Sequence, residues 1–418
     1  MELVKENKVL EFVSDFEKPE GTSEIRQQAF DALNGMDFPT TRVEEWKYTR
    51  VAKYTKKKYK QVQTTTSIDD YVIEGLNAHQ LVFVNGFFDE KASVILDDDA
   101  VVIKRIEELD NAYYTDLLDG TEENVFSLIN KAYETGGAYV RFVKETQAKH
   151  PVHLIHVIEG EEVIAMPRHF IHAEAGAKAE VVVSFHSKNS EDSFTNVVME
   201  GHVEENANLT VQKLQTEDEN VLHIARELFV QDKSSAFMIN TITTGGLLTR
   251  NQLDVLVEGE NCTTDMNGAY LGTGNQHIDN HTYIEQMYSH CLTNELYKGV
   301  MNDQSTGVFN GMILVRPDAQ KIEAYQSNSN ILLSEKSNVF SKPELEIYAD
   351  DVRCSHGSTI GALDEEAVFY LQARGLSKES AEQLLISAFI GDVLDKVENE
   401  AVRNRVNELF LQNFGWRF

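Results

Sequence analysis

The chain contains 418 residues, 42% of them hydrophobic and 25% charged, and it carries a formal net charge of −30 at pH 7. This composition is typical of a soluble globular protein with room for two or three domains. The negative charge argues against nucleic acid or an anionic membrane surface as a partner, because both are bound through basic side chains.

The cysteines and the first residues indicate the environment of the protein. Cys262, Cys291 and Cys354 are too few and too widely spaced for a disulfide framework. The opening segment MELVKENKVLEF is too charged for a secretion signal, and no apolar run approaches the length of a membrane span. We therefore expect a reducing, cytoplasmic location.

Residues 1–80 are predicted to form an N-terminal helical domain. Asp15 to Leu33 combines good helix formers with spaced apolar residues, and Pro39 closes this segment. We expect the first eighty residues to be mostly helical.

Residues 81–150 are predicted to form a mixed α/β connecting region. The segment LVFVNGFF, from Leu81 to Phe88, contains Asn85-Gly86, which is a strong signal for a tight turn between two short strands. A helical pattern follows from Glu122 to Tyr133.

Residues 151–362 are predicted to form a β-solenoid core. Apolar or alternating runs such as EVVVSFH, ANLTVQKL and QLDVLVE are separated by corners that recur every 25 to 31 residues. This spacing favours stacked solenoid coils over an antiparallel sandwich, our second choice, because a sandwich normally turns about every 8–12 residues. The corners are Ala175-Gly176-Ala177, Asn206-Ala207-Asn208, Ser234-Ser235-Ala236 and Gly259-Glu260-Asn261.

Residues 363–418 are predicted to form a C-terminal helical domain of three short helices. Asp364 is a candidate cap for the first helix, Gly375 ends it, and Ser377 is a candidate cap for the second. These helices could cover the end of the solenoid or offer a groove to a partner. The second helix carries an apolar stripe at helical spacing, formed by Ala381, Leu384, Leu385, Ala388, Phe389 and Val393.

The motifs of common enzymes are missing from the sequence. There is no Gly-Lys dipeptide and so no Walker A loop, and G-x-S-x-G, C-x-x-C and H-E-x-x-H are absent as well. Two enzyme hypotheses stay open beside a binding role. One is a solenoid enzyme that acts on polysaccharide, and the other is a self-contained metalloenzyme that uses His277, His281 and Cys354.

Cys354 and His356 are the strongest candidates for chemistry. They lie two residues apart in a strand-like segment, so that the thiol and the imidazole project to the same face. Such a pair suits zinc, copper or iron–sulfur chemistry, while a half-buried cysteine beside a hydrogen-bonded histidine is the structural alternative. An iron–sulfur cluster usually takes four thiolates, which three cysteines cannot supply. We therefore expect no metal in the isolated chain, and a cluster only with ligands from a second chain.

Several long segments carry a family resemblance. They are FPTTRVEEWKYTR, NGAYLGTGNQHIDNHT, ELYKGVMNDQSTGVFNGMILV, AQKIEAYQSNSNILLS and KPELEIYADDVRCSHGSTIGALDEEAVFYLQARG. These segments resemble the SufB/SufD family of iron–sulfur cluster assembly scaffolds. The match is nearer to the SufD branch, because SufB carries a ligand cysteine where this chain has Ser329-Asn330.

The resemblance implies a right-handed parallel β-helix flanked by N-terminal and C-terminal helical domains. It also implies a non-catalytic scaffold subunit whose β-helix end pairs with a SufB-like protein and whose C-terminal helices bind a SufC-like ATPase. His356 corresponds to the interface histidine of the family, with Cys354 beside it, so that a transient cluster is shared with SufB and no cofactor is tightly bound in the isolated chain.

The resemblance and the apolar pattern together suggest contacts for the ATPase and a way for the chain to self-associate. An isolated chain is expected to be able to form a homodimer through the edge meant for SufB, because an unpaired strand invites pairing. The predicted SufC contacts are Phe369, Leu384, Leu385 and Phe389.

Overall fold

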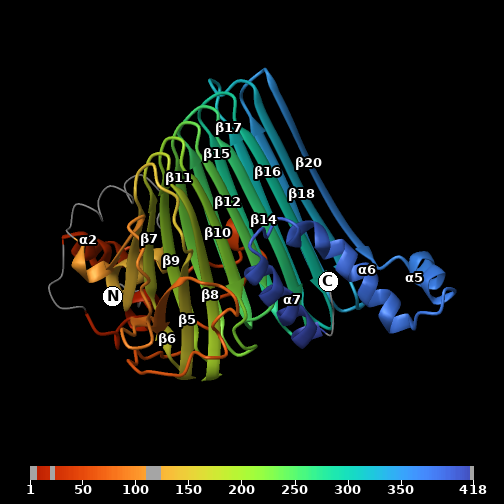
Figure 1. The fold of residues 1–418 in the computed structure, drawn as a ribbon. Coiled ribbons are helices and arrows are strands. Elements are labelled where there is room, and N and C mark those ends of the chain that lie inside the picture. The colour runs from red at the N-terminus through yellow and green to blue at the C-terminus, as the bar shows by residue number, and fades with distance from the viewer. Residues whose placement is uncertain (1–6, 19–23, 110–123, 415–418) are drawn as a thin grey trace, which may run out of the picture.

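A β-solenoid dominates the computed structural model, which describes residues 7–18, 24–109 and 124–414 (Figure 1). Along the solenoid, successive strands lie in opposite sheets, and each strand pairs in parallel with the strands one coil before and one coil after. The prediction of a mainly β chain with a parallel solenoid core and helices at both termini is confirmed. The antiparallel sandwich, our second choice, is wrong because the solenoid strands pair in parallel.

Two sheets form the solenoid. The first sheet contains, in spatial order, β2 (Phe87–Phe88), β1 (His79–Val84), β5 (Val152–Glu161), β8 (Lys178–Glu191), β10 (Asn208–Gln215), β12 (Ala236–Thr243), β14 (Thr263–Gly272), β16 (Leu292–Met301), β18 (Ile322–Leu332) and β20 (Val352–Ala362). The second sheet contains β19 (Asn338–Ile347), β17 (Thr306–Val315), β15 (His277–Gln286), β13 (Leu248–Val257), β11 (Leu222–Gln231), β9 (Phe194–Val203), β7 (Pro167–Ala173), β4 (Gly136–Phe142) and β3 (Val101–Arg105), with β6 (Ile164–Ala165) paired to β9.

The corners between the second sheet and the first are stacked on one another. Each of them places one residue in the left-handed region of backbone space, which glycine, asparagine and aspartate tolerate best. The backbone N–H of that residue donates to a carbonyl of the next coil, as Gly176 does to Glu205 over 2.9 Å. The left-handed residues are 27 to 31 positions apart, and they are Gly176, Asn206, Ser234, Asn261, His290 and Lys321.

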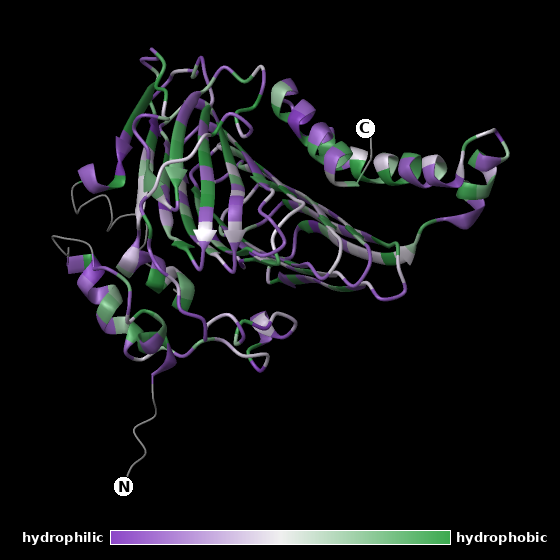
Figure 2. Ribbon diagram, turned by 90° about the horizontal axis from the view of Figure 1, so that it is seen from below, coloured by the Kyte–Doolittle hydropathy of each residue, from purple (hydrophilic) through white to green (hydrophobic). Residues whose placement is uncertain are grey.

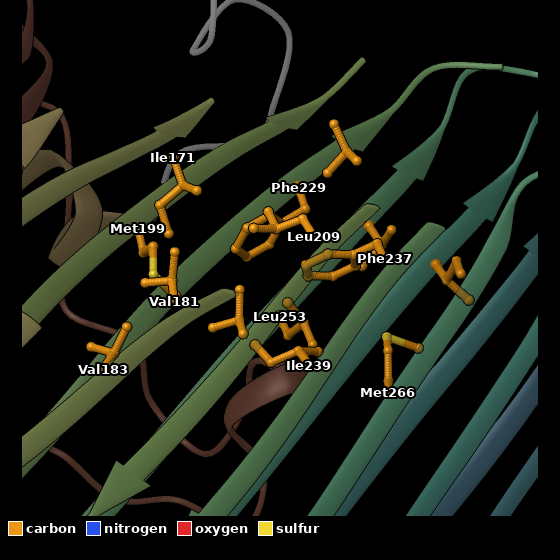
Figure 3. Close-up of a cluster of buried hydrophobic side chains, with 14 of the residues drawn as sticks. Ile171, Val181, Val183, Met199, Leu209, Phe229, Phe237, Ile239, Leu253 and Met266 are labelled. Carbon is orange, nitrogen blue, oxygen red and sulfur yellow. The ribbon is translucent and has the colours of Figure 1, made fainter. Parts of the chain in front are cut away.

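The core lies between the two sheets. Inward side chains of both sheets interdigitate along the whole solenoid, and Figure 3 shows part of this cluster around Val181, Leu209 and Phe237. Each coil alone leaves one apolar layer exposed, so that stacking the coils buries a continuous core. This packing explains why the coil spacing of the sequence predicts the fold.

The Asn85-Gly86 turn is confirmed. β1 and β2 pair antiparallel around it, and Asn85 and Gly86 have φ angles of 53° and 82°. Two successive residues with positive φ are the requirement of the tight hairpin turn that this dipeptide favours.

The N-terminal region covers the outer face of the second sheet. Its described helices are α1 (Lys8–Phe12), α2 (Glu24–Leu33), the 3₁₀ turns η1 (Glu44–Trp46) and η2 (Ile106–Glu108), and α4 (Val125–Tyr133). Their apolar side chains pack on outward residues of that sheet such as Ile164, Phe194 and Ile224. The predicted helix at Glu122 to Tyr133 is confirmed from Val125 on, and its first two residues lie outside the described part of the chain.

Residues 47–78 differ from the expectation of mostly helical structure. The structure describes this segment as turns and extended chain. Its internal backbone bonds are those of single turns, such as the one from the N–H of Tyr54 to Val51, and other backbone groups bond to the solenoid: the N–H of Lys60 donates to Glu162, and the N–H of Ile164 donates to Lys60. Residues 46–60 contain seven lysine and arginine residues and no acid, and they lack a helical apolar stripe. The docking of single side chains such as Tyr59 therefore determines the path of this segment.

The C-terminal helices cover the outer face of the first sheet, so they flank the solenoid and do not close its end. They are α5 (Glu365–Gln372), α6 (Lys378–Leu394) and α7 (Glu400–Phe414). Asp364 and Ser377 cap α5 and α6 as predicted. Ile386, Ile390 and Val393 pack on the sheet, while α5 lies farthest from it (Figures 1 and 2).

The apolar stripe predicted on α6 is partly wrong. Ala381 and Val393 are buried as expected, but Leu384 and Ala388 are exposed, and Ile386 and Ile390 are buried instead. The helix is apolar on more than one face, so the spacing alone could not identify the buried one.

The solenoid ladder begins before the region predicted as its core. β1 pairs with β5, and β4 pairs with β7, so both strands belong to the same sheets as the later coils. The division of the chain at residues 80, 150 and 362 stays a prediction.

Candidate functional site

Cys354 and His356 lie on β20, the last strand of the first sheet. Their register partners on β18 are Ala324 and Gln326, both of which are buried and face the core. Cys354 and His356 therefore project from the inward face of the sheet, as the spacing of two residues predicts. Beyond them the solenoid has no further coil within the described residues, so that this inward face is open at the end.

The two side chains differ in burial. The imidazole of His356 is exposed, while Cys354 is half-buried and packs against the core. Burial raises the pKa of the Cys354 thiol, and a hydrogen bond with the backbone at Ala324 opposes that rise. The histidine is therefore the more accessible ligand, and burial disfavours the thiolate form in which Cys354 would bind a metal.

A buried polar column lies directly beneath His356. Gln326 follows it on β18, and Glu295 follows Gln326 on β16. Gln326 Nε2 donates to Glu295 Oε2 over 2.6 Å, and Thr282 donates its hydroxyl to the other carboxylate oxygen. Burial raises the pKa of Glu295 to about 7, so this acid exchanges a proton near neutral pH.

Hydrogen-bonded hydroxyls join the two sheets next to the column. Ser358 on β20 donates to Ser341 on β19 over 2.7 Å, and Ser341 donates to Asn328 Oδ1 over 2.7 Å. The open end is therefore polar as well as exposed.

The metalloenzyme hypothesis finds no support in this arrangement. His277 accepts or donates a hydrogen bond with Thr49 at 2.9 Å, and His281 Nε2 lies 3.0 Å from Asp279 Oδ1. Both histidines are on β15 of the second sheet, whereas Cys354 is on the last strand of the first sheet. Across the part of the chain that the structure describes, these three side chains form no group close enough to share an ion.

The other two cysteines do not join Cys354. Cys262 and Cys291 are buried at stacked corners, where their thiols bond to backbone carbonyls such as Gly259 O. All three cysteines are free. The chain therefore offers one thiol and one imidazole at its open end.

The predicted ATPase contacts lie on α5 and α6 with different exposure. The side chain of Phe369 is 72% exposed and that of Leu384 is 49% exposed, whereas Leu385 and Phe389 are half-buried. Lys298 of the solenoid donates to the carbonyl of Phe389 over 2.6 Å, which anchors this part of α6. Phe369 and Leu384 are thus free on the surface, while Phe389 also holds the helix to the sheet.

Two residues of the site were missed by sequence reasoning. Glu295 and Gln326 carry no motif, and only the coil register places them under His356. A pair of histidines elsewhere on the solenoid, at residues 172 and 202, was missed as well, although it had an available signal. Their separation of 30 residues equals one coil, which puts them side by side.

Comparison with known proteins identifies the family of the chain. The family model described as the SUF system FeS cluster assembly SufBD core domain matches residues 156–389, and the model of the SufBD protein N-terminal region matches residues 14–154. An iron–sulfur cluster assembly SufBD family protein of Synechocystis is 31% identical over 92% of this chain and 89% of its own length. The iron–sulfur cluster assembly protein SufD of Escherichia coli is 30% identical over 93% and 92%.

These matches define the class to which the fold and the site point, that of iron–sulfur cluster assembly proteins. The chain belongs to the SufBD family and is SufD-like. A chloroplast protein of Arabidopsis thaliana, ABCI7, is 33% identical over 58% of this chain and 51% of its own length. None of the helices in the described ranges combines the length and the apolar character needed to cross a membrane.

Proposed function

We propose that the chain is a non-catalytic scaffold subunit of an iron–sulfur cluster assembly complex. In this proposal it pairs with a SufB-like protein through the last coil of the solenoid and binds a SufC-like ATPase through its C-terminal helices. The observation that carries the proposal is the position of His356. Its side chain is exposed on β20, and within the described residues this strand is paired along only one of its two edges. An open strand edge beside a metal-binding side chain suits a site completed by a second chain.

The cluster itself would be transient and shared with the partner. His356 supplies an accessible imidazole and Cys354 a half-buried thiol, and two side chains fall short of the four ligands that a cluster usually takes. The remaining ligands would come from the SufB-like chain, and no cofactor would stay tightly bound to this chain alone. Cluster iron and sulfide are cargo in this role.

The ATPase would dock on the exposed apolar residues of α5 and α6. Phe369 and Leu384 have large apolar side chains that the described part of the chain leaves exposed. A groove of about 840 Å³ lies beside them, between these helices and the rim of the solenoid, and its lining includes Leu333, Leu363 and Ile386. Exposed apolar residues next to a groove are typical of a partner surface.

Substitution of His356 tests the cluster role. His356→Ala is expected to leave the complex with SufB-like and SufC-like partners intact and to lower the cluster yield several-fold after anaerobic reconstitution, measured by absorbance. Ser355→Ala is the matched control, because Ser355 is exposed on the opposite face of the same strand. A normal cluster yield from His356→Ala contradicts the proposal.

Charge substitutions on α5 and α6 test the ATPase surface. Phe369→Asp and Leu384→Asp are expected to abolish co-purification with the SufC-like protein without changing the thermal unfolding midpoint, because both side chains are largely exposed. Asn404→Asp on α7 adds the same charge at another exposed helical position and should have no effect. Retained binding in both aspartate variants would place the ATPase elsewhere.

The open edge also bears on the chain by itself. Without a partner, β20 of one copy can pair with β20 of a second copy, so a homodimer is expected in the isolated protein. Size-exclusion chromatography with light scattering measures the oligomeric state, and added SufB-like protein should dissociate the homodimer. The proposal also carries the expectation of a cytoplasmic location, where the three free thiols stay reduced.

A further inference from the structure

Two histidines of neighbouring coils stand side by side on the outer face of the second sheet. His172 on β7 and His202 on β9 are register partners, and their rings stack with centroids 5.6 Å apart and planes 4° apart. The neighbours of His172 along the strand, Ile171 and Ala173, point into the core, so that the imidazole points outward.

A carboxylate completes this group. Glu204 lies just beyond the end of β9, and its Oε1 is 2.7 Å from His172 Nε2. One ligand atom from each of His172, His202 and Glu204 lies within 4.8 Å of the others. Metal bonds of about 2.0–2.2 Å place ligand atoms roughly 3–4 Å apart, so small side-chain rotations bring the three to a common ion.

Hydrogen bonds from the surroundings orient the three side chains. The Tyr139 hydroxyl lies 3.1 Å from His172 Nδ1, and the backbone N–H of Ala175 donates to Glu204 Oε2 over 2.8 Å. Metal-ligating histidines usually have such a partner on the second ring nitrogen, which fixes the tautomer and the direction of the first. His202 Nε2 lies 3.0 Å from Asp232 Oδ2, so a second carboxylate is within reach.

The preceding coil shows what a purely structural version of this corner looks like. There Arg141, the register partner of His172, donates to Glu174 over 2.7 Å. A guanidinium pairs with a carboxylate but cannot bind a metal ion, because it has no free lone pair. At the next two coils the cation is replaced by imidazoles, which are the commonest metal ligands in proteins.

We propose that His172, His202 and Glu204 bind a first-row divalent transition ion such as Zn²⁺ or Fe²⁺, with Asp232 or water in the remaining position. Two imidazoles and one carboxylate are a ligand set for such ions, whereas Mg²⁺ and Ca²⁺ prefer oxygen ligands alone. The side chains of the three residues are 20%, 29% and 31% exposed, so an ion reaches them from solvent without unfolding.

The site is separate from the open end of the solenoid. His172 is on β7, and five strands of the second sheet lie between β7 and β19. The proposal therefore does not depend on the scaffold function. It departs from the expectation of no metal in the isolated chain, which was derived from the number of cysteines and did not consider histidines of neighbouring coils.

Titration of the isolated chain tests the site. The full-length, tag-free protein is treated with chelator under reducing conditions and titrated by calorimetry with Zn²⁺, anaerobically with Fe²⁺, and with Mg²⁺ as the hard-ion control. One equivalent of Zn²⁺ or Fe²⁺ is expected to bind and Mg²⁺ is not. His202→Ala and Glu204→Gln should each weaken binding by about tenfold or more.

Control variants separate this site from other ligands. His356→Ala and His290→Asn remove exposed histidines elsewhere and should leave the affinity unchanged. Circular dichroism checks that His202→Ala and Glu204→Gln are folded. Glu204→Gln keeps an acceptor for the Ala175 N–H, so its metal affinity tests the site even if His202→Ala fails to fold. The proposal is overturned if no transition ion binds, if His202→Ala and Glu204→Gln bind like the parent protein, or if His356→Ala abolishes the binding.

Discussion

The first end of the solenoid is closed, and the last end is open. At the first end the antiparallel strands β2 and β3 cover the edges of β1 and β4, whose residues are mostly buried. At the last end none of the residues of β19 or β20 is fully buried, and apolar side chains such as Ile347 and Ile360 are exposed. The same coil geometry therefore has two different terminations.

The two ends of the solenoid differ in what covers their strand edges. Solenoids need polar caps or covering strands to stay soluble, and proteins usually protect free strand edges. The first end has such protection within its own chain. The last end lacks it over the described residues and carries His356, so its covering is expected to come from another chain.

The largest predicted effect concerns a buried ion pair near the first end. Arg168 Nη2 lies 2.5 Å from Glu200 Oε1, and their side chains are 1% and 3% exposed. Arg168→Met leaves the carboxylate buried without its cation, which typically costs about 3–5 kcal/mol of unfolding free energy. Denaturant unfolding measures this loss.

The double variant Arg168→Met/Glu200→Gln serves as the control for that prediction. Removal of both charges should recover part of the lost stability, because the uncompensated carboxylate is then gone. A cost below about 1 kcal/mol for the single variant would show that the first end does not depend on this pair.

The second prediction concerns Glu295, two strands inside the open end. Its folded pKa of about 7 lies above its ordinary value of 4.5, so the folded state binds more protons in between. The stabilisation of the folded state by the protonated Glu295 is therefore complete below pH 4.5, and it is lost as the pH rises through 7. Glu295→Gln should remove this loss and make the protein more stable at pH 8 by up to about 3 kcal/mol.

Thermal unfolding from pH 5 to pH 8.5 measures the effect of Glu295→Gln. Gln326 has a buried Oε1 without a hydrogen-bond partner, so its amide can rotate to accept from the new glutamine. Identical pH profiles for the parent and the variant would contradict the prediction, because the carboxyl group would then titrate alike in the folded and unfolded states.

The smallest predicted effect concerns an ion pair on the last strand. Arg353 Nη1 lies 3.5 Å from Glu323 Oε1, and the two side chains are 80% and 45% exposed. Arg353→Met should change the unfolding free energy by less than about 0.5 kcal/mol, because solvent screens exposed pairs. The same unfolding assay applies, and a loss comparable to that of Arg168→Met would abolish the contrast between the two ends.

The sequence predicted the fold correctly where a preference of single residues or short segments also marks the repeat of the solenoid coil. Corners at Gly176, Asn206 and Ser234 could be recognised because their residues are small or polar, and each of these three adopts the left-handed conformation. The strands β9 and β11 were not recognised. On β11, Arg226 is paired with Asp254 of the next coil, and the buried Glu227 is paired with a lysine of the opposite sheet. On β9, Glu200 is buried in a pair with Arg168 of the preceding coil. Such charged residues interrupt the apolar runs that mark a strand.

The candidate site was predictable in part for the same reason. The separation of two residues places Cys354 and His356 on one face of a strand, and this is a local rule. That the face is inward and lies at an open end depends on the stacking of all earlier coils. The partners beneath His356, Gln326 and Glu295, are 30 and 61 positions away, and only the coil register relates them.

The stacked left-handed corners make the molecule modular in length. Because each coil is about 30 residues long and repeats the same corner, deletion of one whole coil would preserve the pattern of ladder and corner contacts between the remaining coils. It would shorten the molecule by one strand spacing, roughly 4.8 Å. Deletion of a single strand residue would instead exchange inward and outward side chains downstream. The number of coils thus sets the distance between the covered end and the surface that carries His356.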